Sequence, residues 1–325
     1  MHGSRAARTA KIGGLLALVA IAASGCSGQQ IIRFGWPKGV TPEAHQMRLL
    51  WTWSGIAALI IGVIVWGLIA WTVIFHRKKG DGLPRQFQYN HSLEIVYTVL
   101  PLVIVVVLFY FTTVVQNNVL RHVKPDVPVN VVAFQWNWEF DYPNTQIKDP
   151  SGKPVPGPDG KPQIVRTIGT SQEIPLLVLP INKTIGYTLR SNDVIHSFFV
   201  PDFHFKRDVF PYPNKNDQDD YFVNSIDQPG EFVGRCAELC GTYHSMMNFE
   251  VRALPDKIFN RYISLREQIN PQTNLPYNAQ EALSKINCGP KLCAPHAITT
   301  APFDTSRTSR HASTSSTGRD VNQGE

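Results

Sequence analysis

A short segment, residues 235–247, concentrates side chains that bind soft metal ions. It reads R-C-A-E-L-C-G-T-Y-H-S-M-M and contains Cys236, Cys240, His244 and Met247. Thiolate, thioether and imidazole groups together form a ligand set that suits copper. Two cysteines four positions apart on one loop can place both sulfurs on a shared pair of ions. The histidine then completes one ion, and the methionine can approach weakly from the axial side.

A second imidazole must come from elsewhere in the chain, and His196 in D-V-I-H-S-F-F-V-P is the best candidate upstream. Four interpretations of the segment then compete. A disulfide between Cys236 and Cys240 suits an exported protein but leaves the spacing of the histidine and the methionine unexplained. A zinc site favours two cysteines with two histidines, and Met247 then has no role.

The other two interpretations are copper sites. A mononuclear blue-copper site needs one cysteine, two histidines and a weak axial methionine, so the second cysteine is surplus. A dinuclear copper site uses every residue, and the second ion can take the backbone carbonyl of Glu238; the spacing favours this site. A closed, rigidly held site suits electron transfer rather than bond chemistry. Outer hydrogen bonds should orient the imidazoles, and Asp193 is a candidate partner, with an ordinary turn residue as the equally weighted alternative.

The ligands lie in a region, residues 120–260, whose short β-type runs are separated by Pro and Gly. Eight strands are predicted, at residues 127–134, 136–142, 173–179, 184–191, 195–200, 221–225, 231–235 and 248–253. So many short strands indicate a β-sandwich or a barrel. Residues 143–169 and 211–220 are predicted to be exposed loop insertions. Residues 255–268 are predicted to form a short helix that closes the domain.

Beyond this domain, residues 261–325 are expected to be a C-terminal extension. Its last part, from about residue 297, is rich in Ser, Thr and Arg and has almost no apolar residues, which predicts disorder. Cys288 and Cys293 do not match the C-x-x-C-H motif of covalent haem attachment. A local disulfide between them is predicted in an oxidising compartment.

The run F-Q-W-N-W-E-F alternates aromatic and polar residues. A strand here places Phe134, Trp136, Trp138 and Phe140 on one face, as part of the core. An exposed aromatic side chain near the metal loop would also offer electrons a route inward. Asp141 and nearby carboxylates could dock a basic partner.

Residues 1–25 have the features of an export signal, with a basic start, a short apolar run and small residues before Cys26. The apolar run is too short to span a bilayer. A small-residue site that ends in cysteine predicts a lipoprotein signal with Cys26 lipidated, although Ala23 stands where leucine is usual. Cleavage nearby with Cys26 unmodified is the alternative.

Two longer apolar stretches follow, at residues 49–75 and 93–115, and each is long enough to cross a membrane. They predict a transmembrane helical hairpin within residues 45–118. The connection between them is basic, and its charged residues are Arg77, Lys78, Lys79, Asp81 and Arg85. The positive-inside rule puts this connection in the cytoplasm and the following domain outside.

Glu94 is the ionisable residue near the membrane in the second stretch. As a carboxylate in the first turn of a helix capped by Ser92 or Asn90, it complements the helix dipole. The residues alone favour this structural role. The functional alternative is a point of proton uptake at the cytoplasmic face.

The 325-residue chain has a formal net charge of +6. Much of the basic excess lies in the N-terminal segment and in the loop between the apolar stretches, whereas residues 120–260 carry more Asp and Glu than Lys and Arg. A mildly acidic domain argues against nucleic acid and for a basic protein partner.

Four motifs together carry a family resemblance. They are C-x-E-x-C-G-x-x-H-x-x-M from Cys236, D-V-x-H-S from Asp193, Q-W-x-W from Gln135 and E-x-x-x-T-x-L-P from Glu94. Over roughly residues 45–260 the chain resembles subunit II of the haem–copper cytochrome c oxidases, in a bacterial, actinobacterial form. The resemblance implies an N-terminal two-helix transmembrane hairpin followed by an all-β cupredoxin domain, a Greek-key sandwich.

The resemblance also implies a dinuclear copper A centre in that domain. Its ligands would be His196, Cys236, Glu238 through its carbonyl, Cys240, His244 and Met247. The Glu238 side chain would also reach a magnesium ion shared with subunit I. Trp136 looks like the tryptophan through which electrons enter from cytochrome c. Glu94 looks like the carboxylate at the mouth of a proton channel, which reverses the weighting given above.

By this resemblance, the chain accepts electrons from a c-type cytochrome and passes them to subunit I, which reduces oxygen to water and translocates protons. The implied partners are subunits I and III, membrane lipid and the cytochrome, and not nucleic acid. In some bacteria of this kind the donor is membrane-bound in a partner complex, and the insertions could contact it. The implied location is the bacterial cell membrane, multi-pass, with the copper domain on the extracytoplasmic side.

Two other copper A or related proteins are alternatives. A quinol oxidase subunit II shares the fold but has lost the copper ligands, all of which are present here. A copper A protein of the nitrous oxide reductase type lacks the membrane hairpin that this sequence predicts.

Overall fold

The computed structural model describes most of the chain. The described residues are 13–14, 33–77, 80, 82, 86–170, 174–215, 217–289 and 292–293. Four features of the sequence therefore lie outside the described residues: nearly all of the predicted signal segment, its Cys26, most of the basic loop cations, and the tail from residue 294.

The chain forms two compact units. The first contains Arg48–Phe111, and the second contains Gly39–Met47 together with everything from Thr112 onward.

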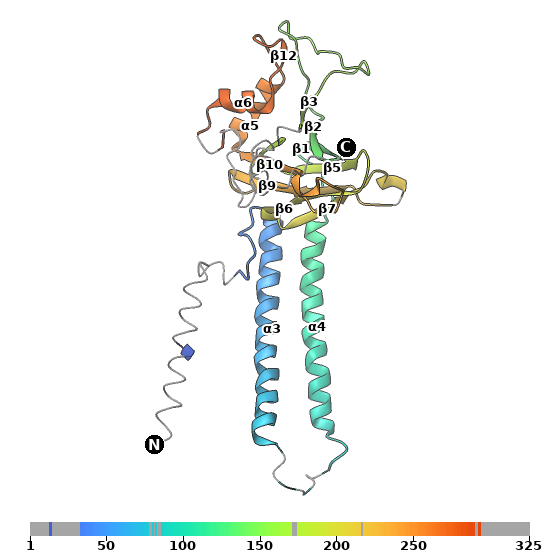
Figure 1. Ribbon diagram of the computed structural model, residues 1–325, viewed down its shortest axis with the longest axis vertical. Coiled ribbons are helices and arrows are strands. Elements are labelled where there is room, and N and C mark those ends of the chain that lie inside the picture. The colour runs from blue at the N-terminus through green and yellow to red at the C-terminus, as the bar shows by residue number, and fades with distance from the viewer. Residues whose placement is uncertain are drawn as a thin grey trace, which may run out of the picture. The chain divides into compact units, whose positions relative to one another are not determined.

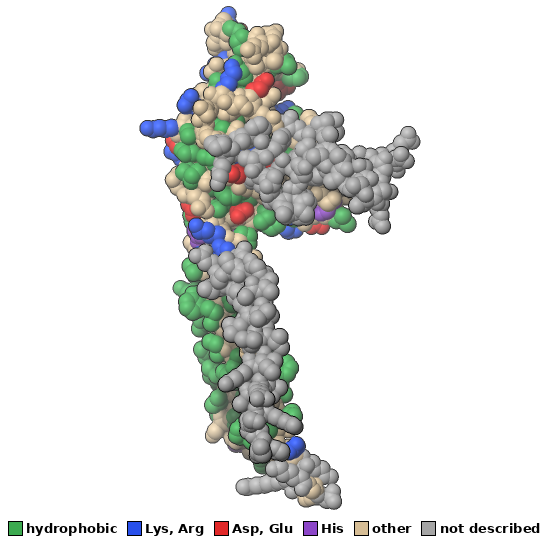
Figure 2. All heavy atoms as spheres, turned by 60° about the vertical axis from the view of Figure 1, so that its left-hand side comes forward, with side chains coloured by type: hydrophobic (Ala, Val, Ile, Leu, Met, Phe, Trp, Pro, Cys, Tyr) green, Lys and Arg blue, Asp and Glu red, His purple; other side chains and the backbone are tan. Residues whose placement is uncertain are grey.

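Two long apolar helices dominate the first unit, α3 (Pro42–Phe75) and α4 (His91–Val119), and they run in opposite directions (Figure 1). Each is long and apolar enough to cross a membrane, and no residue of its most apolar stretch is buried. Hydrophobic side chains lie along the visible part of this surface (Figure 2). Exposure of so many apolar side chains to water is unfavourable, so these helices are more stable in the hydrocarbon of a lipid bilayer. The predicted hairpin of two apolar helices is confirmed.

Helix α3 begins earlier than the apolar stretch that predicted it. Pro42 occupies the first helical position, where its missing N–H costs no hydrogen bond. The hydroxyl of Thr41 accepts a hydrogen bond from the N–H of Ala44 at 3.0 Å, which caps the helix. The polar residues of this first turn hid the helix start from a prediction based on hydropathy.

The second unit is a sandwich of two five-stranded sheets. The first sheet has the order β3 (Val165–Ile168), β2 (Asn137–Tyr142), β1 (Val127–Phe134), β5 (Ile185–Ser191) and β8 (Tyr221–Asn224). The second has the order β4 (Leu176–Pro180), β10 (Asn248–Leu254), β9 (Gly230–Cys236), β6 (His196–Val200) and β7 (Phe205–Val209). Strands β1 and β5 are parallel, as are β4 and β10, and the other pairs are antiparallel.

Aromatic side chains from both sheets fill the space between them. Trp138 and Phe140 of β2 meet Phe249 of β10 edge-on, each with ring centroids 5.3 Å apart. Phe198 of β6 stacks on Phe249 at 4.9 Å. Edge-to-face and stacked pairs of this kind add stability beyond the area that they bury. This core fixes β6, β9 and β10 relative to one another.

The aromatic run around Trp136 differs from the expectation. Phe134 pairs with Asn137 across a tight turn, and Gln135 and Trp136 form that turn between β1 and β2. The prediction of one strand with four aromatic residues on a core face is therefore wrong, because the chain reverses in the middle of the run. Only Trp138 and Phe140 are fully buried.

The two predicted loop insertions are more ordered than expected. Residues 143–169 contain strand β3, and a backbone hydrogen bond of 2.7 Å from Lys148 to Glu267 attaches the insertion to the end of a helix, α5. Residues 211–220 contain a 3-10 turn, Pro213–Lys215. Strand β7 just before it was not predicted.

The domain continues past residue 260. Helix α5 (Asp256–Arg266) is the predicted closing helix, and residue 260 falls inside it. After the small hairpin β11 (Ile269–Asn270) and β12 (Leu275–Pro276), a further helix, α6 (Ala279–Ile286), joins the same hydrophobic core through its buried face. The expected boundary is therefore too early. Cys288 and Cys293 form the predicted disulfide.

Candidate metal centre

The predicted ligands come from two neighbouring strands and the loop that follows one of them. Cys236 is the last residue of β9, and Cys240 lies in the loop that leads to the 3-10 turn His244–Met246. Met247 follows that turn, directly before β10. His196 is the first residue of β6, which pairs with β9 so that Phe198 faces Cys236. Sheet pairing thus brings the separate histidine to the cysteine loop.

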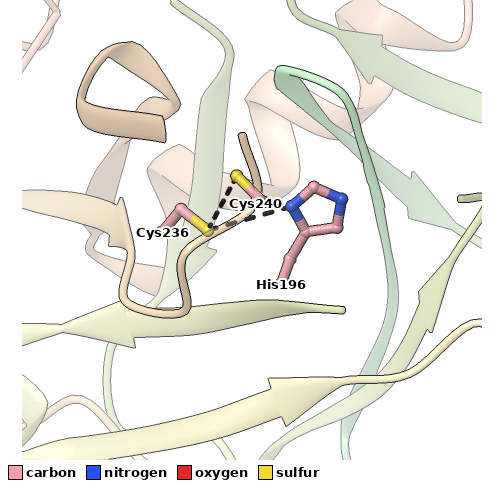
Figure 3. A group of neighbouring side chains, drawn as sticks. All are labelled: His196, Cys236 and Cys240. Atoms are coloured by element: carbon pink, nitrogen blue, oxygen red, sulfur yellow. Dashed lines mark hydrogen bonds between the residues drawn. The ribbon is translucent and has the colours of Figure 1, made fainter. Parts of the chain in front are cut away.

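The two sulfurs and the imidazole of His196 face one another (Figure 3). The distance between the Sγ atoms of Cys236 and Cys240 is 3.8 Å, and Nδ1 of His196 lies 3.8 Å from Sγ of Cys236. On the other side, Nδ1 of His244 lies 3.6 Å from Sγ of Cys240. Each sulfur therefore has one imidazole nitrogen beside it.

The remaining two predicted ligands complete this arrangement. The carbonyl oxygen of Glu238 lies 3.2 Å from Sγ of Cys236, and Sδ of Met247 lies 3.8 Å from Sγ of Cys240. All six predicted donor groups are thus gathered around one pair of sulfurs.

These donors fit a soft metal centre. A metal–thiolate bond is about 2.3 Å for zinc, so sulfurs 3.8 Å apart can both contact one ion. Thiolates, imidazoles and a thioether are ligands of copper rather than of magnesium or calcium. His196 and Met247 are fully buried, and Cys236 and Cys240 are nearly so. A buried site of this kind excludes substrate.

The two thiols have different acidities. Burial raises the pKa of Cys236, but the hydrogen bond with His196 and backbone contacts outweigh it and lower the pKa to about 7. Burial, followed by the charge of Cys236, raises the pKa of Cys240 to about 12. The metal-free site therefore carries one thiolate near neutral pH and keeps the other sulfur protonated.

Asp193 makes the outer hydrogen bond that was predicted for it. Its Oδ1 lies 2.8 Å from Nε2 of His196, and its Oδ2 accepts a hydrogen bond of 2.6 Å from the N–H of Gln135. Burial opposes ionisation of Asp193, but these hydrogen bonds outweigh it and lower its pKa. The carboxylate therefore holds a proton on Nε2 and leaves Nδ1 of His196 free to face the sulfur.

Trp136 reaches the metal loop directly. Its indole N–H donates to the carbonyl oxygen of Cys240 at 3.1 Å, and the side-chain amide of Gln135 donates to the same oxygen at 2.8 Å. The ring of Tyr243 stands edge-on to that of Trp136, with centroids 5.0 Å apart. At Gly241 a Cβ would lie 3.1 Å from the indole ring, so glycine permits this close approach.

Sequence reasoning missed the roles of three of these residues. Gln135 stood inside the quoted Q-W-x-W motif, but nothing in its spacing predicted a hydrogen bond to the metal loop. Gly241 stood inside the quoted cysteine motif, but nothing there predicted its contact with the indole ring, and Tyr243 carried no signal. Both contacts depend on the turn at Trp136.

The carboxylates of Glu238 and Glu94 each contact a basic side chain. The Glu238 carboxylate is partly exposed and lies 3.5 Å from Nζ of Lys206. Glu94 lies in the first unit, in the first turn of α4, where its Oε1 accepts a hydrogen bond of 3.0 Å from the N–H of Asn90. Its Oε2 lies 3.3 Å from Nδ1 of His91. This is the capping arrangement that the residues alone favoured.

Comparisons with known proteins agree with this architecture. The model of the cytochrome c oxidase subunit II periplasmic domain matches residues 127–254, and the model of its transmembrane domain matches residues 30–113. A probable cytochrome c oxidase subunit 2 of Nocardia farcinica is 47% identical, over 95% of this chain and 91% of the relative. The chain belongs to the cytochrome c oxidase subunit II family.

Another member of this family, cytochrome c oxidase subunit 2 of Mycobacterium tuberculosis, is 44% identical over 94% of this chain and 91% of that protein. The solved periplasmic domain of subunit II of cytochrome oxidase (CoxB) of Bradyrhizobium japonicum is 26% identical. That alignment covers 44% of this chain and 94% of the other, with a TM-score of 0.33. The predicted family and its actinobacterial kinship are confirmed.

The residues matched by the two family models end before the last part of the domain. The gathered donor groups and both apolar helices lie within the matched residues. Helices α5 and α6 and the disulfide between Cys288 and Cys293 lie after residue 254, beyond both family models.

Proposed function

We propose that this chain is the subunit of a cytochrome c oxidase that accepts electrons from a c-type cytochrome and passes them to subunit I. There oxygen is reduced to water and protons are translocated. One observation carries the proposal: two buried sulfurs 3.8 Å apart, each with an imidazole nitrogen within 3.8 Å. A closed ligand set on two paired strands keeps its geometry when its charge changes, as electron transfer requires.

The group held there is a dinuclear copper A centre. Its ligands are His196, Cys236, Glu238 through its carbonyl, Cys240, His244 and Met247. When bound, this pair of ions supplies a carrier for one electron at a time. The protein residues supply the rest: Cys236 is already close to its thiolate form at neutral pH, and Asp193 keeps His196 in the tautomer that faces the sulfur.

Trp136 is the residue through which electrons arrive. Support comes from its hydrogen bond of 3.1 Å to the carbonyl of Cys240 and from its partly exposed ring, which a donor can approach. Its position in a turn, rather than inside a strand, is what makes that approach feasible.

Two carboxylates have proposed roles outside the copper centre. The Glu238 carboxylate contributes to a magnesium site shared with subunit I. It can do so because the backbone carbonyl of Glu238 faces Cys236, whereas the carboxylate faces away from the sulfurs, toward Lys206. Glu94 begins α4 and serves at the mouth of a proton channel. Its capping contacts and this role are compatible, because the side chain is partly exposed.

The protein is a multi-pass protein of the bacterial cell membrane with its copper domain on the extracytoplasmic side. The basic connection after α3 supports this orientation through the positive-inside rule. The helices are surrounded by subunits I and III and by lipid. The c-type cytochrome binds to the copper domain, and in a supercomplex this cytochrome is membrane-bound. Cys26 is the site of lipidation after removal of residues 1–25.

Metal analysis of the full chain, combined with a spin spectrum, tests the copper proposal. Two coppers per chain, with one unpaired electron shared between both nuclei, are expected. One copper per chain, or a spectrum from a single ion, would contradict the dinuclear centre. Cys240→Ser should abolish the shared spectrum, whereas Thr242→Ala, a matched change at an exposed residue of the same loop, should leave it unchanged.

A further inference from the structure

A cleft of about 780 Å³ lies on the second unit, and none of the proposed copper ligands lines it. It opens between the edge strands β3 and β4, and the insertion after β2, the end of α5 and the start of α6 form its walls. Its walls are largely apolar, with Ile147, Ile164, Ile168, Ile174, Leu176 and Pro276 among them. The volume and character match those of small-molecule sites.

One cation is buried in this cleft. Arg266, the last residue of α5, lines it and is only 5% exposed. Its guanidinium donates to the hydroxyls of Thr167 and Tyr262 at 2.9 and 2.7 Å and to the carbonyl of Arg166 at 2.6 Å. All three acceptors are uncharged, so the positive charge of Arg266 has no neutralising partner among them.

The guanidinium also retains an unused donor. Nε of Arg266 is buried and has no hydrogen-bond partner in the part of the chain that the structure describes. Among the described residues no ion pair joins Arg266 to an acid. A buried charge without a counter-charge, and a buried N–H without an acceptor, both cost free energy. An anion that enters the cleft relieves both costs at once.

Three other charged residues line the cleft, and none of them supplies that anion. Lys161 is an exposed cation, and the other two are Arg166 and Asp159. Arg166 is already paired with Asp141 and Glu139, at 2.7 and 3.0 Å. The carboxylate of Asp159 accepts a hydrogen bond from the backbone N–H of Lys161 at 3.2 Å, within its own turn. The cleft therefore keeps a net attraction for negative charge at Arg266.

We propose that this cleft binds a small organic carboxylate with an apolar body. The carboxylate accepts a hydrogen bond from Nε of Arg266, and the body lies against the apolar walls around Ile168, Ile174 and Pro276. A bare inorganic anion would leave those walls unfilled, and a neutral apolar molecule would leave Arg266 uncompensated. The site is independent of electron transfer, since it shares no residue with the proposed copper centre.

Binding of a fluorinated probe tests the proposal. The full chain in lipid nanodiscs is titrated with 4-(trifluoromethyl)benzoate and, separately, with the neutral 4-(trifluoromethyl)benzamide, and ¹⁹F NMR reports binding against empty nanodiscs. We expect saturable binding of the benzoate and binding of the amide that is weaker by about tenfold or more, because only the carboxylate brings a negative charge to the guanidinium of Arg266. Equal affinities, or no saturable binding of the benzoate, would overturn the proposal.

Variants locate the binding to the cleft. Arg266→Met should weaken benzoate binding by about tenfold or more, whereas Arg261→Met, on the exposed side of the same helix, should change it less than about twofold. Because Arg266→Met can also disturb folding, a second pair acts at the half-exposed Ile168. Ile168→Glu should weaken benzoate binding and Ile168→Lys should strengthen it. Equal binding by these two variants would place the probe elsewhere and refute the site.

Discussion

The indole nitrogen of Trp136 and the carbonyl oxygen of Cys240 are joined by a hydrogen bond of 3.1 Å. A partly exposed aromatic ring is thus one hydrogen bond away from the backbone of a proposed copper ligand. The turn that carries Trp136 is also fixed to Asp193, through the N–H of Gln135, and Asp193 in turn contacts His196. One turn therefore connects the surface to both halves of the ligand set.

Replacement of Trp136 should slow the arrival of electrons without disturbing the metal. In Trp136→Ala we expect the rate of electron transfer from the cytochrome to fall by about tenfold or more, equivalent to ~1.4 kcal/mol on the barrier. The copper spectrum should be retained, since Trp136 is not a ligand. Stopped-flow reduction of the assembled oxidase measures the rate.

The control for this experiment is Leu275→Ala, which removes an exposed apolar side chain of β12, outside both insertions and the metal loop. It should leave the rate unchanged. An unaltered rate in Trp136→Ala with the native donor would exclude Trp136 as the point of arrival.

Asp193 should influence the metal centre without contacting it. Asp193→Ala removes the acceptor beside Nε2 of His196, so the imidazole loses its fixed tautomer. Loss of such an outer partner typically costs about 10–100-fold in metal affinity. Competition with a copper chelator measures this loss. Asp193→Asn keeps an acceptor but no charge, so its copper affinity should lie between those of the unchanged protein and Asp193→Ala.

The exposed Asp217→Asn provides the matched control, because its change in charge is the same and it lies outside the loop. Equal copper retention by Asp193→Ala and Asp217→Asn would show that the contact with His196 has no effect on the centre.

Much of the fold was predictable because its signals are local. All eight predicted strands are present, since short apolar-rich runs separated by turn-forming residues mark them. The disulfide and the two apolar helices followed from spacing and length alone. The gathering of the six donor groups was expected from their chemistry, because the dinuclear copper interpretation left no donor unused.

What was missed depends on tertiary context. Strand β7 contains Lys206, Arg207 and Asp208 in succession, which a sheet accepts only at an edge such as this one. Strand β3 has only four residues, also at an edge. Helix α6 did carry a signal, since Asn278 and Glu281 form a capping box, but its surroundings were interpreted as an extension.

Copper uptake by the metal-free protein should depend on pH. The pKa of Cys236 is lowered to about 7 and that of Cys240 is raised to about 12. Both sulfurs must lose their protons to bind metal. Above pH 7 only Cys240 still carries a proton, whereas below pH 7 both cysteines do. The pKa of His196 is raised, so this imidazole also takes up a proton as the pH falls and must lose it when metal binds.

We therefore expect more protons to be released per bound copper pair at pH 6 than at pH 8, and affinity to fall more steeply with acidity below pH 7. Calorimetry in buffers of different ionisation enthalpy counts these protons. The same number of released protons at both pH values would contradict the acidity assigned to Cys236.

Reduction of the disulfide between Cys288 and Cys293 should destabilise the domain. The loop that it closes contains Leu292, whose carbonyl accepts a hydrogen bond of 3.2 Å from the fully buried Arg252 of β10. Opening the loop releases this acceptor and restores chain entropy to the unfolded state. Closure of so short a loop contributes about 2 kcal/mol in the entropic model. The double variant Cys288→Ser, Cys293→Ser should therefore lower the free energy of unfolding by about that amount, measured by denaturant titration of the metal-free chain and followed by tryptophan fluorescence.

A reducing agent should lower the stability of the native protein equally and leave the variant unaffected. If the variant and the reduced protein unfold at the same denaturant concentration as the oxidised protein, the loop contributes nothing to the stability of the sandwich.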